Sequence, residues 1–183
     1  SNTAIYYIDF SFDNFQLGGS AFAQSLGKIG KTAPTVKDSE YFVSAFNTIQ
    51  ELIEKDLILA GHDISAGGMI TALLEMNFGN PEGGLEINLD KIAEKDIIKI
   101  LFSENPGVLI QVKDKNSVEK ILQNNGIGFS KIGRPCKERH ILVKKDNAEY
   151  QFGIDYLRDV WFSSSYLLDR KQSGEKAAAA RFN

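Results

Sequence analysis

The residues with the clearest capacity for chemistry lie in one short segment, His62-Asp63-Ile64-Ser65-Ala66-Gly67-Gly68. Asp63 supplies a carboxylate, a hard oxygen ligand suited to Mg²⁺, and Ser65 supplies a hydroxyl that can donate to a phosphate oxygen or a nucleotide. Gly67 and Gly68 carry no side chains, so an anionic group can approach their backbone closely. Together these residues predict a Mg–nucleotide site with Asp63 as the metal ligand and Ser65, Gly67 and Gly68 as nucleotide contacts.

The setting of this segment supports the prediction but does not decide it. The run Leu57–Ala60 is interpreted as a buried strand that leads into the segment, and a helix follows through Met69 and Met76. The first turn of a helix offers unpaired N–H groups and the positive end of the helix dipole. A structural interpretation competes, because Gly-Gly is common in strand-to-helix turns and Asp63 or Ser65 could simply cap the helix. His62 is expected to be a structural residue rather than a ligand.

The elements that must position the segment alternate between strand-like and helix-like patterns, and no internal repeat is found. Predicted strands are Ile5–Phe12, Leu85–Leu89, Gly107–Val112, Gly128–Ile132, His140–Lys144 and Tyr150–Phe152. Predicted helices follow Asp38 to about Lys55, span Ala93–Phe102, begin near Asn116 with Glu119 in a capping-box arrangement, and carry Leu157, Trp161, Ser164 and Leu168 on one side. This mixture predicts an α+β fold, a mixed sheet packed with helices.

Composition excludes several classes of partner. The chain has 183 residues, enough for one domain, with 43% hydrophobic and 25% charged residues and a formal net charge of −3. That charge gives no electrostatic reason to expect nucleic acid or an anionic membrane as a partner. A single cysteine, Cys136, excludes an internal disulfide and fits a cytoplasmic location. The chain begins Ser-Asn-Thr without a methionine, so we expect it to be excerpted from a longer protein.

Four segments resemble, in the right order, motifs of the phosphoribosylformylglycinamidine synthase family. His62–Gly68 is similar to the family signature His-Asp-x-Ser-Asp-Gly-Gly, and Leu17–Gln24 resembles its Leu-Gly-Gly-Ser-x-x-Ala-Gln stretch. The segment from Leu101 to Val112 looks like its Phe-x-Glu loop and the strand that follows. Leu157–Trp161 is similar to a helix near the end of the large, single-chain form. The resemblance covers about residues 4 to 170.

This resemblance implies the three-layer fold of an aminoimidazole-ribonucleotide-synthetase C-terminal-like domain over residues 1–170. It further implies that the chain is the C-terminal half of the second synthetase repeat, with residues 171–183 as a connector toward a glutaminase domain. The family is a ligase of purine biosynthesis and a glutamine amidotransferase. It converts formylglycinamide ribonucleotide, glutamine and ATP to the amidine, ADP, phosphate and glutamate. The implied partners are therefore ATP or ADP, Mg²⁺, the ribonucleotide substrate, the N-terminal synthetase domains and the glutaminase domain.

Carried over residue by residue, Asp63 matches a Mg²⁺ ligand and Ser65 a nucleotide contact, while no catalytic residue is assigned. The sequence departs from the family at Ala66, where a second carboxylate is usual. Two alternatives therefore stay open. The chain could be a non-catalytic scaffold with an auxiliary structural nucleotide, or the same domain of aminoimidazole ribonucleotide synthetase or another ATP-dependent relative.

Three further groups of residues were weighed as sites. Gly18-Gly19-Ser20 could cradle a phosphate or form a tight turn, and the two interpretations are held equal. Glu104 could bind substrate or metal but more often such a residue caps or forms an ion pair, and Glu75 is expected to be a charge at the edge of the packing. Cys136 with His140 could form a nucleophilic pair, but the run resembles a turn between strands and is interpreted as structural.

Overall fold

Strand β1, Ala4–Asp9, lies third in a seven-stranded sheet in the computed structural model, which describes residues 2–182. The strand order is β2-β4-β1-β5-β3-β6-β7. The other strands are β2 Ile58–Asp63, β3 Gly84–Asn88, β4 Gly107–Val112, β5 Ser130–Cys136, β6 His140–Lys145 and β7 Ala148–Gly153. The helices are α1 Ala21–Ser25, α2 Ser39–Glu54, α3 Gly68–Phe78, α4 Ile97–Phe102, α5 Lys115–Asn124, α6 Ile154–Ser173 and α7 Glu175–Phe182. The sheet is mixed, because β3 and β6 pair in parallel whereas the other neighbours are antiparallel.

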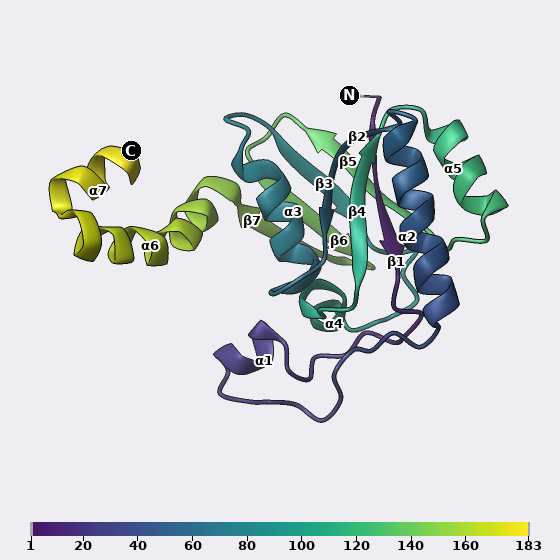
Figure 1. Cartoon of the computed structure of the whole chain (residues 1–183), viewed down its shortest axis with the longest axis horizontal. Helices are drawn as coiled ribbons and strands as arrows, with labels where there is room; N and C mark the ends of the chain where they lie inside the picture. The colour runs from purple at the N-terminus through teal and green to yellow at the C-terminus, as the bar shows by residue number, and fades with distance from the viewer. Residues whose placement is uncertain (1, 183) are drawn as a thin grey trace.

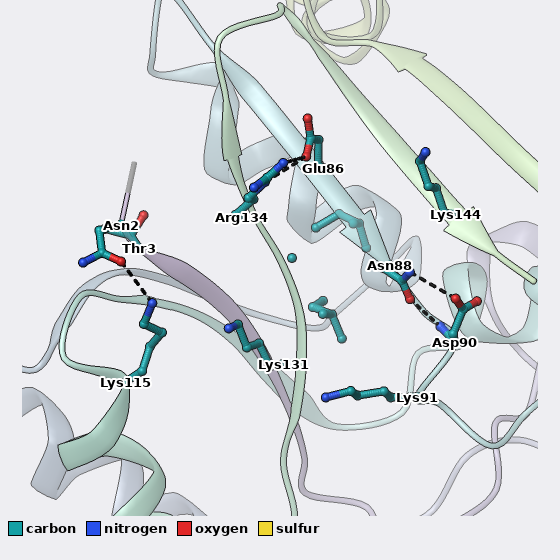
Figure 2. A pocket seen from close by; sticks show the side chains of 13 residues that line it. Asn2, Thr3, Glu86, Asn88, Asp90, Lys91, Lys115, Lys131, Arg134 and Lys144 are labelled. Carbon is teal, nitrogen blue, oxygen red and sulfur yellow. Dashed lines mark hydrogen bonds and ion pairs between the residues drawn. The ribbon is translucent and has the colours of Figure 1, made fainter.

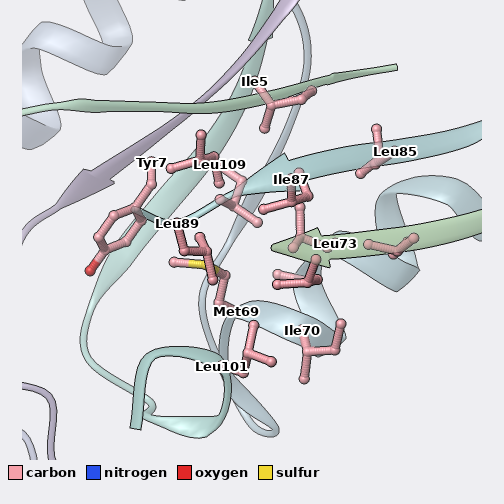
Figure 3. Packing of buried hydrophobic residues seen from close by; sticks show 14 of the residues in the cluster. Ile5, Tyr7, Met69, Ile70, Leu73, Leu85, Ile87, Leu89, Leu101 and Leu109 are labelled. Atoms are coloured by element: carbon pink, nitrogen blue, oxygen red, sulfur yellow. The ribbon is translucent and has the colours of Figure 1, made fainter. Parts of the chain in front are cut away.

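Side-chain alternation along β1 divides the interior into two cores. Ile5 and Tyr7 face a core shared with α3 and α4, and Figure 3 shows Met69 and Leu73 of α3 in that core. Tyr6 and Ile8, which alternate with them, face a second core made with α2 and α5. Because a strand points successive side chains to opposite faces, both helical layers are built around this one strand. Figure 1 shows α2 and α5 on one side of the sheet and α3 and α4 on the other. The predicted three-layer α+β fold is confirmed.

Helix starts were predicted with mixed success. The Asp38 carboxylate accepts hydrogen bonds from the backbone N–H groups of Glu40 and Tyr41, so the predicted cap of α2 is confirmed. The predicted start of α5 at Asn116 is wrong, because Asp114 caps this helix by accepting from the Ser117 N–H. Asp and Asn cap helices about equally well, so the residue type does not decide between positions 114 and 116, and it is Asp114 that makes the capping hydrogen bond.

The prediction of a buried strand at Leu57–Ala60 is also wrong. β2 begins at Ile58, continues to Asp63 and lies at the edge of the sheet, where it pairs with β4. Most of its residues are exposed, and Leu59 keeps 55% of its accessible surface. A short apolar run is typical of a buried strand, but the position of a strand in the sheet depends on pairings that a local pattern does not contain. The edge position leaves Asp63, the last residue of β2, near solvent.

The C-terminal helices stand apart from the sheet (Figure 1). α6 begins against the main core through buried Ile154 and through Leu157, and Trp161 packs against Phe78 of α3 with ring centroids 5.9 Å apart. α6 continues through Ser173, past residue 170, where the sequence predicted the domain to end and a connector to begin. That domain boundary stays a prediction. The outer ends of the predicted ranges, residues 1 and 183, lie outside the described residues. Within residues 2–182, no helix is both long and apolar enough to span a membrane.

The two environments of leucine can be compared by substitution. Leu73 of α3 is fully buried, so Leu73→Ala is expected to lower the free energy of unfolding by about 2–5 kcal/mol through lost burial and a residual cavity. Leu59→Ala, the same change on the exposed face of β2, is expected to cost about 0.5 kcal/mol or less. Denaturant titration of both variants measures this difference. Equal losses would contradict the edge position of β2.

Candidate functional site

The site predicted from sequence lies where the edge strand β2 turns into α3. Gly67 and Gly68 both adopt positive φ angles, 89° and 75°, which favour glycine. A Cβ atom on Gly68 would lie 2.7 Å from the carbonyl oxygen of Leu101 and 2.8 Å from the backbone of Phe102. Glycine at position 68 therefore serves close packing between the start of α3 and the end of α4.

The side chains that precede the two glycines are open to solvent. Asp63 keeps 75% of its side-chain surface, and Ser65 and Ala66 are exposed. Gly67 is the N-cap residue of α3, and neither Asp63 nor Ser65 makes a side-chain capping hydrogen bond to this helix. The interpretation of Asp63 or Ser65 as a helix cap is therefore wrong. Within residues 2–182 the Ser65 hydroxyl makes no hydrogen bond, so both predicted ligand groups are available to bind something outside this chain.

His62 lies between two acidic residues. Its Nδ1 is 2.7 Å from the backbone oxygen of Asp63 and 3.7 Å from the carboxylate of the same residue, while its Nε2 is 3.1 Å from a carboxylate oxygen of Glu75. The Asp63 carbonyl and the Glu75 carboxylate are both acceptors. The contacts at 2.7 Å and 3.1 Å are therefore both hydrogen bonds only in the form of the ring with a proton on each nitrogen. Glu75 was expected to be an edge charge, and its contact with His62 links α3 to the end of β2. The expectation that His62 is not a ligand stays a prediction.

Glu104 joins the two glycine-rich segments. A single oxygen of its carboxylate accepts hydrogen bonds from the backbone N–H of Gly67 at 2.8 Å and from that of Ala21 at 2.7 Å. These two donors stand at the starts of α3 and α1, where backbone N–H groups lack partners within the helix. A carboxylate at such positions is also favoured by the helix dipole. Of the interpretations weighed for Glu104, the structure shows the capping one.

A buried polar cluster holds the loop between β1 and α1 against the site. The side-chain amide of Asn105 donates to the Ser11 hydroxyl and to the backbone oxygen of Asn14, both at 3.0 Å. The Ser103 hydroxyl lies 2.9 Å from the backbone nitrogen of Gln16 and 2.7 Å from its oxygen. Sequence reasoning missed these residues. The one signal in the sequence was that Ser103 and Asn105, both polar, lie beside Glu104 between two apolar segments.

The Gly18-Gly19 segment forms a tight turn. Its N–H groups donate to loop carbonyl oxygens, Gly18 to Thr32 at 2.8 Å and Gly19 to Ile29 at 2.7 Å, and the Ser20 hydroxyl caps α1. Amide groups already bonded in this way cannot also cradle a phosphate, so the turn interpretation is the one that the structure supports.

The thiol of Cys136 does not form the pair with His140 that the sequence offered. The thiol lies 3.6 Å from the backbone oxygen of Glu138 rather than in contact with His140, and burial raises the pKa of the thiol. A raised pKa lowers the thiolate fraction and therefore the nucleophilicity.

The acidic residues of the site suffice for a shared cation site and not for a closed one. Within the described part of the chain, no group of three or more His, Cys, Asp or Glu side chains is placed to hold a metal ion. Mg²⁺, however, usually takes one or two protein carboxylates and completes its shell with water and substrate phosphates. An exposed Asp63 with an unpartnered hydroxyl two residues on fits that mode of binding.

The architecture defines a three-layer α+β domain with a glycine-rich junction at the edge of its sheet. The chain belongs to the family described as AIR synthase related protein, C-terminal domain, whose model matches residues 13–145. It is 33% identical over 172 residues to a probable phosphoribosylformylglycinamidine synthase, chloroplastic/mitochondrial, of Arabidopsis thaliana, covering 92% of this chain and 12% of that protein. It is 29% identical to the phosphoribosylformylglycinamidine synthase of Homo sapiens, covering 96% of this chain and 13% of that protein.

Solved structures share the fold. The Thermotoga maritima PurL complexed with ATP matches with a TM-score of 0.65 at 15% identity, covering 86% of this chain and 26% of that one. The same protein complexed with FGAR matches with a TM-score of 0.66 at 18% identity, covering 86% and 28%. The chain thus spans only about an eighth of the curated relatives and about a quarter of these structures.

The role of Glu104 can be tested by two substitutions. Glu104→Ala removes the shared acceptor of Gly67 and Ala21, and we expect the free energy of unfolding to fall by about 1–2 kcal/mol, as for a lost helix cap. Hydrogen exchange at both amides should accelerate. Glu104→Gln keeps an acceptor oxygen and should retain most of the protection. Unchanged exchange in Glu104→Ala would show that the carboxylate does not hold these segments together.

Proposed function

We propose that this chain is part of a phosphoribosylformylglycinamidine synthase and supplies one side of a Mg–nucleotide site in that enzyme. The observation that carries the proposal is the pair of exposed ligand groups, Asp63 and Ser65, at a strand-to-helix junction. Support comes from relatives of that name, which match this chain over nearly its whole length. PurL structures with ATP and ADP further support nucleotide binding by this fold.

In this proposal each residue of the junction has a distinct task. Asp63 would hold Mg²⁺, and the Ser65 hydroxyl would donate to the nucleotide. The N–H groups of Gly67 and Gly68 already donate, to Glu104 and to the backbone oxygen of Ser65, so these two glycines would shape the turn that presents Asp63 and Ser65 to the nucleotide. Bound Mg²⁺ supplies positive charge that offsets the charge of the phosphates. Glu104 acts as a positioning residue, since it fixes the Gly67 backbone.

The remaining ligands would come from other parts of a longer polypeptide. One carboxylate does not complete a Mg²⁺ shell, and Ala66 stands where the family usually has a second one. We infer that the N-terminal synthetase domains complete the site, and that residues 171–183 lead toward a glutaminase domain. The proposed reaction forms the amidine from formylglycinamide ribonucleotide with ATP and with ammonia from glutamine, in the cytoplasm.

A second candidate keeps the same nucleotide but gives it a structural task. Two observations favour it: the neutral Ala66, and the lack of a complete acidic cluster in the described residues. In this case the chain is a scaffold stabilised by an auxiliary nucleotide. A third candidate is the same domain of aminoimidazole ribonucleotide synthetase or of another ATP-dependent relative.

Asp63→Asn in the full-length polypeptide separates the first two candidates. Removing one Mg²⁺ ligand from a catalytic site should lower turnover by about tenfold or more with the thermal midpoint nearly unchanged. A structural site should instead lose bound nucleotide and thermal stability first. Asp56→Asn is the matched control, because it removes the same charge from an exposed turn just before β2, at the opposite end of that strand from Asp63. If Asp63→Asn changes neither turnover, bound nucleotide nor stability, no Mg–nucleotide site lies at this junction.

The isolated chain is expected to show no ligase or glutaminase turnover, because one side of a site cannot run the reaction. Ammonia-dependent formation of the amidine, followed as ADP release, measures this. Turnover by these 183 residues alone would contradict the division of the site between this chain and other domains.

A further inference from the structure

The helical layer formed by α2 and α5 leaves half of its side of the sheet open. The second core contains residues of β1 and β4 together with the two helices, and none from β3, β6 or β7. On β3 and β5, Ile87 and Ile132 point into the core beneath α3, so their neighbours Glu86 and Lys131 point to the open side. That side carries a hollow of about 740 Å³ (Figure 2), within the range typical of small-molecule sites.

The lining of the hollow is basic in a protein that is acidic overall. It includes five cationic side chains, Lys91, Lys115, Lys131, Arg134 and Lys144, and two acidic ones, Glu86 and Asp90. The local balance is therefore positive by three charges, whereas the whole chain has a formal net charge of −3. Such local concentration of one sign attracts ligands of the other.

Both acidic groups are already engaged. The Glu86 carboxylate pairs with the Arg134 guanidinium at 2.7 and 2.9 Å. The Asp90 carboxylate accepts from the backbone N–H of Asp146 at 2.7 Å and from the side-chain amide of Asn88 at 3.1 Å, and these bonds lower the pKa of Asp90. Lys144 is likewise paired, with Glu149 at 2.6 Å. With Glu149 counted beside Lys144, five cations stand against three carboxylates, and the local excess is two positive charges. Asp90 stays charged because its hydrogen-bond donors are neutral.

The excess comes from three lysines on separate elements. Lys91 follows β3, Lys115 opens α5 and Lys131 lies near the start of β5; Figure 2 shows them around one opening. Among residues 2–182, no carboxylate lies within 4 Å of any of their amino groups, and Lys115 contacts only the neutral amide oxygen of Asn2, at 3.2 Å. Three uncompensated ammonium groups repel one another, and a multiply charged anion would relieve that repulsion.

We propose that this hollow binds a phosphate-bearing anion of about mononucleotide size, held by Lys91, Lys115 and Lys131. Lysine acts as a point charge toward phosphate, and three of them match the dense charge of a diphosphate better than the single charge of a carboxylate. The hollow is separate from the junction of β2 and α3, since its lining includes none of the residues from Asp63 to Gly68. The proposal does not depend on the proposed ligase activity.

Titration of pyrophosphate into the isotopically labelled chain, followed by amide NMR shifts, tests this. Shifts are expected around Lys131 and Lys115, with affinity that falls as salt rises. The double variant Lys91→Gln/Lys131→Gln should bind pyrophosphate at least about tenfold more weakly, since two charge-assisted contacts are lost. Lys171→Gln, the same change on exposed α6, should bind like the unaltered chain.

Two outcomes would overturn the proposal. One is a set of shifts confined to the segment from Asp63 to Met69, which would place the anion at the other site. The other is equal affinity of the double variant and the unaltered chain. Unaltered amide spectra away from the substituted positions confirm that the variants fold. A glutamate hexapeptide that binds where pyrophosphate does not would identify the hollow as a contact for an acidic protein surface, which also contradicts a phosphate site.

Discussion

The close backbone contact between the start of α3 and the end of α4 is the constraint on which the candidate site depends. Gly68 has a positive φ and lies so near Leu101 and Phe102 that no Cβ fits between them. This contact brings the loop after α4 to the end of β2. Glu104, in that loop, then reaches the backbone of both Gly67 and Ala21. The N–H groups at two helix starts are satisfied from inside the protein, and Asp63 and Ser65 are left facing outward.

The core beneath this junction keeps it in place. Met69 and Leu73 of α3 are buried against β1 and β4, and Leu101 of α4 packs beside them (Figure 3). The loop between β1 and α1 is held by buried hydrogen bonds of Asn105 and Ser103, and by Phe15, which packs against the core. Buried polar groups of this kind are costly unless they are paired, so the cluster fixes one arrangement of the loop. A rigid frame thus presents a few exposed ligand groups.

Local patterns predicted the parts of the fold that depend on local physics. The β propensity of its residues predicted β4 with its correct bounds, and Asp38 was recognised as a cap because capping involves residues close in sequence. The edge position of β2 and the two hydrogen bonds accepted by Glu104 were not predicted. They depend on pairing with β4 and on contacts across 37 and 83 residues, and no single segment contains that information. The motif itself was placed correctly at a strand-to-helix junction, but the side chains of Asp63 and Ser65 do not cap the helix.

We propose that the junction from Asp63 to Gly68 contacts a Mg²⁺-bound nucleotide in the longer polypeptide. Hydrogen–deuterium exchange of that full-length polypeptide, with and without Mg²⁺ and ADP, tests this most directly. Slower exchange is expected in the peptide that spans Asp63 to Met69 when both are present, and a smaller effect without Mg²⁺. Unchanged exchange there, under conditions in which the nucleotide is bound elsewhere in the protein, would contradict it.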